Sequence, residues 1–189
     1  GKIIRVDLAA REFAVEDIDP AIERDYIGGR GVGSKILFDE VDPEVDPLSP
    51  ENKLIFMTGP LTGTGAPCSA RYMAITKSPL TGAIACSNSG GYFPAELRFA
   101  GYDGIIFEGK ADEPVYLWIK DDEIEIRDAA HLWGKTTHET EDLIRAEIDD
   151  PWLAKEIHIA SIGPAGENLG KLACIINDKN RAAGRSGVG

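Results

Sequence analysis

Short apolar segments that end at turns follow one another along this chain, and they restrict the folds it can adopt. Apolar and polar residues alternate at 2–18 around a short turn, a pattern that predicts a β-hairpin. Strands that turn back so soon pair most readily in antiparallel sheets. Further strands are expected at residues 54–58, 71–76, 83–87, 105–108, 115–120, 123–127, 157–162 and 171–176.

Helical patterns are few and do not alternate regularly with these strands. Thr136 and Glu139 have the spacing of a capping box, so we expect a helix from there to about Ile148, ended by Pro151. Other short helices are expected at residues 20–27, 34–41 and 94–102. The chain is therefore predicted to be α+β, with mostly antiparallel β-sheets and a few short helices, rather than a doubly wound fold.

One order of features occurs twice along the chain. An apolar strand, a Gly-Pro pair, a glycine, a second strand, an asparagine and a glycine-rich turn follow one another at 54–91, and a similar order recurs at 157–187. We interpret the repetition as a duplication and expect a two-lobed arrangement with pseudo-twofold character.

Charge and cysteine content narrow the functional classes. The net charge of −12 disfavours nucleic acid and anionic lipid as partners, and no apolar run is long enough to cross a membrane. The three cysteines lack metal-binding spacing and are read as small core residues, which suits a reduced, cytoplasmic location. The chain also stops within a glycine-rich loop, so we expect it to be part of a larger protein.

The clearest functional signal is a stretch without acidic residues. None of the 32 acidic residues lies between Glu51 and Glu96, whereas six glycines and the basic residues Lys53, Arg71 and Lys77 do. Glycine lets backbone N–H groups converge on an anion, and arginine adds a forked donor. The stretch predicts an anion site; the alternative is a buried, glycine-rich sheet region that excludes all charge.

A second basic segment lies near the end of the chain. Lys179, Arg181 and Arg185 fall within seven positions and are followed by glycine. The segment favours a phosphate or another polyanion, and the alternative is a solvated loop.

By contrast, the glycines at 28–33 lack a preceding strand and the spacing of a dinucleotide fingerprint. We therefore expect a turn between two helices there, with Arg30 as an optional ligand contact.

Catalytic side chains are scarce. His131, His138 and His158 are scattered, and neither a nucleophile–histidine set nor an HExxH motif can be identified. We therefore assign no catalytic residue to this chain.

Several longer motifs occur in the order typical of one enzyme family. They are Pro50-Glu51-Asn52-Lys53-Leu54, Gly59-Pro60-Leu61-Thr62-Gly63, Thr76-Lys77-Ser78-Pro79-Leu80-Thr81-Gly82, Asn88-Ser89-Gly90-Gly91-Tyr92-Phe93, Phe99-Ala100-Gly101-Tyr102-Asp103, Ile162-Gly163-Pro164-Ala165-Gly166-Glu167-Asn168 and Arg181-Ala182-Ala183-Gly184-Arg185. Through them, residues 1–189 resemble the N-terminal domain of the tungsten-containing aldehyde:ferredoxin oxidoreductase family. One departure is Cys68-Ser69-Ala70, where a more glycine-rich stretch is expected.

The resemblance implies a cofactor in which two pterins hold tungsten, or molybdenum in some relatives, with Mg²⁺ bridging the pterin phosphates. It implies that the backbone carbonyls of Asn88 and Ala182 are Mg²⁺ ligands, since this hard cation prefers oxygen donors. The residues implied to contact the pterin phosphates or rings are Arg71, Asn88, Gly90, Arg181, Ala182, Gly184 and Arg185.

The resemblance also implies an activity for the parent enzyme. A small aldehyde is oxidised to a carboxylic acid, and electrons pass through a [4Fe–4S] cluster, bound outside this chain, to ferredoxin. A homo-oligomer is expected, and the isolated chain should be inactive. Alternatives are a carboxylate or aromatic-acyl reductase with the same pterin centre, a free-standing pterin- or phosphate-binding module, and a structural β domain that binds nothing.

Overall fold

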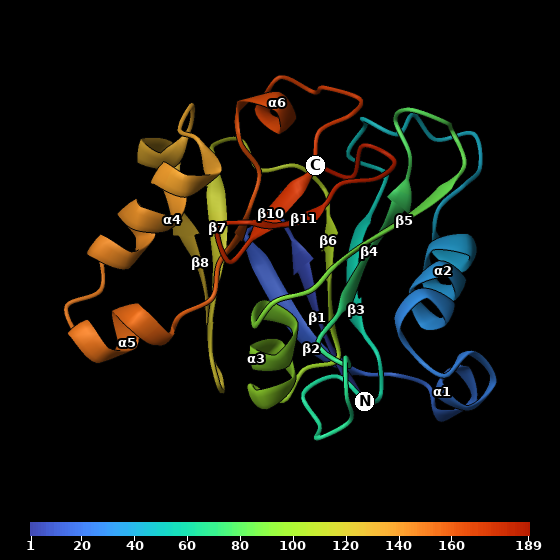
Figure 1. Ribbon diagram of the computed structural model, residues 1–189. Coiled ribbons are helices and arrows are strands. Elements are labelled where there is room, and N and C mark those ends of the chain that lie inside the picture. Colours follow the sequence, from blue (N-terminus) through green and yellow to red (C-terminus); the bar gives the residue numbers. More distant parts are fainter.

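The computed structural model describes all residues, Gly1–Gly189, and its centre is a six-stranded sheet (Figure 1). The strand order is β2-β1-β6-β3-β4-β5; β1 and β6 are parallel, and every other neighbouring pair is antiparallel. The strands are β1 (Lys2–Asp7), β2 (Glu12–Asp17), β3 (Leu54–Thr58), β4 (Tyr72–Lys77), β5 (Ile84–Ser89) and β6 (Gly104–Glu108).

Two smaller antiparallel sheets pack against one face of the large sheet. A hairpin consists of β7 (Val115–Lys120) and β8 (Glu123–Asp128), and a three-stranded sheet has the order β11-β10-β9. The strands of the latter are β9 (Ala160–Ser161), β10 (Ile175–Asn177) and β11 (Arg181–Ala183). The α+β fold with mostly antiparallel sheets is therefore confirmed.

The two segments with repeated sequence order form the same local structure. Strands β3-β4-β5 make an antiparallel meander within the large sheet, and β9-β10-β11 make a second, shorter one as a separate sheet. The strand expected at 157–162 is only two residues long, and residues 181–183 pair as a strand where a loop was expected. Strand β11 pairs with β10, the strand directly before it, whereas β9 pairs with β10 across residues 162–174.

Six short helices complete the fold, two more than expected. Pro151 does not merely end the preceding helix but opens α5, because Asp150 caps its first turn by accepting from the Trp152 and Leu153 amides. The predicted capping box of α4 is present at Thr136 and Glu139. The helices are α1 (Pro20–Tyr26), α2 (Gly29–Glu40), α3 (Phe93–Phe99), α4 (Thr137–Ala146), α5 (Pro151–Glu156) and α6 (Pro164–Glu167), with a 3₁₀ turn at Ala130–Leu132.

The turn expected between two helices at 28–33 is present but shorter, because α1 ends at Tyr26 and α2 already begins at Gly29. Its glycines permit close packing. A Cβ on Gly31 would lie 2.2 Å from the Tyr26 carbonyl oxygen, and one on Gly33 would lie 2.5 Å from Cδ1 of Ile75. Tertiary packing thus outweighs the low helix propensity of glycine, which makes a helix less stable by about 1 kcal/mol per residue relative to alanine.

The central strands of the large sheet are buried on both faces, as the alternation along β1 illustrates, whereas edge strand β2 is exposed. Ile3 packs with α2 on one face, whereas Ile4 and Val6 pack on the other with side chains of α3, β8, β10 and β11. Helix α2 therefore covers one face, and α3 with the two small sheets covers the other (Figure 1). None of the helices combines the length and hydrophobicity that crossing a bilayer requires.

Candidate anion site between two edge strands

The fold brings the two predicted anion-binding segments together. Strand β5 is the edge of the large sheet, β11 is the edge of the small one, and the two lie in contact. A Cβ on Gly91 would lie 3.1 Å from Cγ of Arg181, and the Arg185 amide donates to Oγ of Ser87 at 3.0 Å. We call this region the two-loop surface; it comprises Arg71, Asn88, Gly90, Arg181, Ala182, Gly184 and Arg185.

The arginines of the two-loop surface have no carboxylate partner. Five of the ten arginines in the chain form ion pairs with acidic side chains, whereas Arg71, Arg181 and Arg185 form none. All three are exposed, and Arg71 donates only to Oδ1 of Asn88. In a chain with a net charge of −12, such a set of unpaired guanidinium groups is suited to bind phosphate.

The other basic residues of the two predicted segments serve the fold instead. Lys53 pairs with Glu40 at 3.2 Å and with Glu108, and Nζ of Lys77 donates to backbone carbonyls of the loop that follows α2. Lys179 pairs with Asp142. Their positions in the sequence alone did not distinguish these lysines from the arginines that lack a carboxylate partner.

Arg30 also lies apart from the two-loop surface. It belongs to the first turn of α2, which covers the face of the large sheet opposite α3 and β11 (Figure 1). No hydrogen bond or ion pair joins Arg30 to the other candidate residues.

A buried asparagine connects the two loops from the interior of the protein. Asn177 is fully buried; its Nδ2 donates to the Gly90 carbonyl at 2.7 Å, and its Oδ1 accepts from Oγ of Ser89 at 2.6 Å. The Tyr72 hydroxyl reaches the same Oδ1 at 3.5 Å, and burial raises the pKa of that hydroxyl. These supporting residues were missed from the sequence, although Asn177 lies only two positions before the second basic segment.

Next to Asn177, the Asp178 carboxylate is mostly buried, with 13% of its side chain exposed, and it forms no ion pair with an arginine. It accepts from the Tyr92 amide at 2.8 Å, the Phe93 amide at 3.2 Å and Nδ2 of Asn177 at 2.8 Å, and it contacts Nδ1 of His158 at 2.5 Å. Burial alone would raise the pKa of Asp178, but these hydrogen bonds outweigh it and hold the pKa below its usual value. The carboxylate therefore remains charged without neutralising the surface.

Oxygen donors for a hard cation are available at the same place. Asn88 lies on edge strand β5 and Ala182 on edge strand β11, and neither carbonyl accepts a hydrogen bond from a side chain or from backbone outside the sheets. No group of three or more His, Cys, Asp or Glu side chains is placed to hold a metal ion. A cation here would thus need backbone carbonyls together with oxygens from a ligand.

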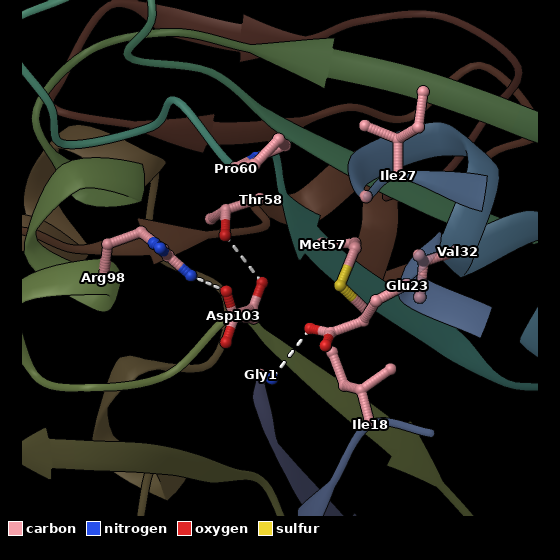
Figure 2. Close-up of a pocket in the computed structure, with 11 residues that line it drawn as sticks. Gly1, Ile18, Glu23, Ile27, Val32, Met57, Thr58, Pro60, Arg98 and Asp103 are labelled. Carbon is pink, nitrogen blue, oxygen red and sulfur yellow. Dashed lines mark hydrogen bonds and ion pairs between the residues drawn. The ribbon is translucent and has the colours of Figure 1, made fainter. Parts of the chain in front are cut away.

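A cavity of about 270 Å³ lies elsewhere, between α1, α2 and the adjoining ends of β1, β3 and β6 (Figure 2). Its polar groups are satisfied within the chain. Asp103 pairs with Arg98 and accepts from the Lys2 amide at 2.8 Å, and the Gly1 ammonium pairs with Glu23 at 2.7 Å. No residue of the two-loop surface lines this cavity, so it is a separate feature.

Comparison with known proteins places the chain among oxidoreductases. Residues 3–189 match the family described as "Aldehyde ferredoxin oxidoreductase, N-terminal domain". The chain is 58% identical to the tungsten-containing aldehyde ferredoxin oxidoreductase of Pyrococcus furiosus and 55% identical to that of Thermococcus kodakarensis. Both matches cover 100% of this chain, which spans 31% of the length of each relative.

A solved structure has the same fold. It is the active site complex BamBC of benzoyl coenzyme A reductase with 1,5-dienoyl-CoA, at 44% identity and a TM-score of 0.94. The match covers 100% of this chain and 28% of that chain. From the family match and these identities over its whole length, the chain belongs to the aldehyde ferredoxin oxidoreductase family.

Proposed function

We propose that this chain is the cofactor-binding domain of a larger enzyme that oxidises aldehydes to carboxylic acids. The two-loop surface would contact the phosphates of a bis-pterin cofactor carrying tungsten. The observation that carries the proposal is the convergence of three arginines without carboxylate partners and two glycine-containing loops on one surface. The tungsten-containing relatives at 55–58% identity support the same role.

The residues present fit such a group. Gly184 has a negative φ, and a Cβ built on it would meet nothing closer than 3.9 Å, so nothing within the chain requires glycine there. A missing side chain with free space around it is suited to the close approach of a ligand. When bound, the tungsten–pterin group supplies the two-electron redox chemistry, and the protein orients it.

Each part of the two-loop surface has a distinct binding role in this proposal. Arg71 and Arg181, whose Cγ atoms flank Gly90 and Gly91, bind phosphate oxygens through their forked guanidinium groups, and Arg185 adds a third. The carbonyls of Asn88 and Ala182 hold Mg²⁺ between the two loops. Phosphates and cation together would thus fasten the cofactor to both edge strands.

The remaining parts of the reaction belong to the whole enzyme. We propose that residues outside this chain would hold a [4Fe–4S] cluster, which would supply electron transfer to ferredoxin. A small aldehyde as substrate, a homo-oligomer and a cytoplasmic location complete the proposal. These features rest on the family membership and are tested on the full-length protein.

The test compares full-length wild-type protein with an Arg71→Ala/Arg181→Ala double variant. We expect wild-type protein to contain tungsten by elemental analysis and to reduce benzyl viologen with aldehydes, and the double variant to lose both. Arg11→Ala is the matched control, since Arg11 also lacks a carboxylate partner but lies in the turn between β1 and β2. Wild-type metal content in the double variant would contradict the proposed site.

A second candidate is a reductase of an aromatic acyl thioester with the same type of pterin centre. It is supported by the 44% identity and the TM-score of 0.94 to the benzoyl coenzyme A reductase complex. The 58% identity to an aldehyde-oxidising relative favours the first candidate. Parallel assays with aldehydes and with aromatic acyl-CoA substrates separate the two, because only one substrate class should support viologen turnover.

A further inference from the structure

The two halves of the two-loop surface are not joined by a common sheet. Strand β5 ends the large sheet and β11 ends the small one, so no ladder of backbone hydrogen bonds fixes their relative position. Side chains must do so instead. The contacts between the loops on the side of Gly90 all start from the turn between β10 and β11, at Asn177 and Asp178.

Asp178 makes the closest of these approaches. A Cβ on Gly91 would lie 2.2 Å from Oδ2 of Asp178, while the Cγ of Arg181 would be 3.1 Å from the same Cβ. The Asp178 carboxylate and the Arg181 stem thus both pack against the same side of Gly91, where a side chain would otherwise lie. Since Oδ2 also accepts from the Tyr92 and Phe93 amides, one carboxylate fixes the exit of the first loop against the second.

His158 fixes the orientation of that carboxylate. Its Nδ1 lies 2.5 Å from Oδ1 of Asp178, and its ring stacks on Tyr92 with centroids 5.3 Å apart. Both oxygens of Asp178 therefore have hydrogen-bond partners other than the arginines. An acidic residue three positions before Arg181 would otherwise be well placed to pair with it and neutralise the site.

We propose that Asp178, oriented by His158, is the positioning residue of the two-loop surface and holds both loops at the spacing that binding of phosphate groups requires. This inference rests on the proposed function and deepens it. Asp178 does not touch the ligand; it acts through Gly90–Tyr92 and Arg181. Asp178→Asn keeps the shape but removes the charge and leaves only one acceptor oxygen for four N–H donors, so the hydrogen bonds that hold the loops together are weakened.

The experiment uses the full-length protein, prepared without tungstate or molybdate, with inorganic pyrophosphate as the probe. We expect Asp178→Asn to speed hydrogen exchange at the Tyr92 and Phe93 amides and to weaken pyrophosphate binding, each by about tenfold, as expected for loss of charged hydrogen bonds. Asp142→Asn is the matched control, because Asp142 is an exposed carboxylate, 68% accessible, that pairs with Lys179 in the same region. It should leave both quantities unchanged.

A second pair of variants leaves Asp178 in place. His158→Gln retains an N–H donor and should stay close to wild type, whereas His158→Phe retains a ring against Tyr92 but loses the donor and should weaken pyrophosphate binding. Unchanged exchange or unchanged affinity in Asp178→Asn, or equal behaviour of the two His158 variants, overturns the positioning role. Wild-type protein that does not bind pyrophosphate overturns the proposed function instead, and the exchange measurement still reports on Asp178.

Discussion

At the scale of single residues, glycines that look alike in the sequence serve opposite purposes. Gly91 has φ +100°, and its missing Cβ leaves room for the Asp178 carboxylate. Gly184 has a negative φ and free space around its Cα. The first glycine is required by the protein itself, whereas the second is required only if a ligand occupies the space beside it.

Gly91→Ala is expected to destabilise the protein without any ligand present. The new methyl group would collide with Asp178 and would force a left-handed backbone on alanine, at a cost of about 2 kcal/mol or more. Chemical denaturation of the cofactor-free protein measures the effect. A free energy of unfolding equal to that of wild type would show that the two loops are not closely packed.

Gly184→Ala is expected to have the reverse profile. Stability should change by less than about 0.5 kcal/mol, since the methyl group meets no atom closer than 3.9 Å. The tungsten content of the full-length protein should fall, because the methyl group fills space that the proposed cofactor would occupy. Measuring the free energy of unfolding and the tungsten content on one preparation separates an effect on folding from an effect on binding. An unchanged tungsten content would show that Gly184 is not part of the site.

At the scale of elements, α2 shows how one helix is fixed at both ends. Its glycine-rich first half packs closely on the sheet, and its last residue, Glu40, binds Arg5 of β1 at 2.9 Å and Lys53 at 3.2 Å. Burial alone would raise the pKa of Glu40, but the hydrogen bond from Arg5, with a further contribution from Lys53, holds it below 4.5. The ion pairs therefore join α2 to strands of the large sheet.

The sign of the resulting pH dependence follows from the lowered pKa of Glu40. Its contribution to stability is complete above the unfolded value of 4.5 and is lost as the pH falls through the lower folded value. Glu40→Gln should therefore be less stable than wild type at pH 7, and the difference should shrink below about pH 4. Urea unfolding at several pH values checks this; a difference independent of pH would contradict it.

At the scale of the whole molecule, the distribution of charge defines the candidate site. Thirty-two acidic residues give the chain its net charge of −12, yet the surface between β5 and β11 presents three unpaired arginines. The one nearby carboxylate of the β10–β11 turn, Asp178, is mostly buried and forms no ion pair with an arginine. An anionic ligand is therefore attracted to one region of an otherwise acidic protein.

The isolated chain of residues 1–189 is expected to show no aldehyde-dependent viologen reduction. It offers a candidate anion site but no group of three or more His, Cys, Asp or Glu side chains placed to hold a metal ion. The full-length protein, assayed in parallel, should be active. Turnover by the isolated chain would show that the redox site is complete within these residues.

The sequence by itself determined the elements that depend on local pattern. Alternating residues identified the β1–β2 and β7–β8 hairpins, and the spacing of Thr136 and Glu139 identified the cap of α4. The charge distribution also identified both segments of the two-loop surface. These features involve neighbours within a few positions, so their physical cause is contained in the local sequence.

Only the tertiary structure decided the rest. It made Gly29–Gly33 helical, paired Arg181–Ala183 as a strand, and assigned Lys53 and Lys77 to the fold while leaving Arg71 free. The helical glycines and the lysines depend on partners distant in the chain, such as Ile75 for Gly33 or Glu108 for Lys53, whereas Arg181–Ala183 pairs with the preceding strand β10. Local patterns do not identify such partners, which is why the meeting of the two loops, and the burial of the Asp178 carboxylate, became visible only in the folded molecule.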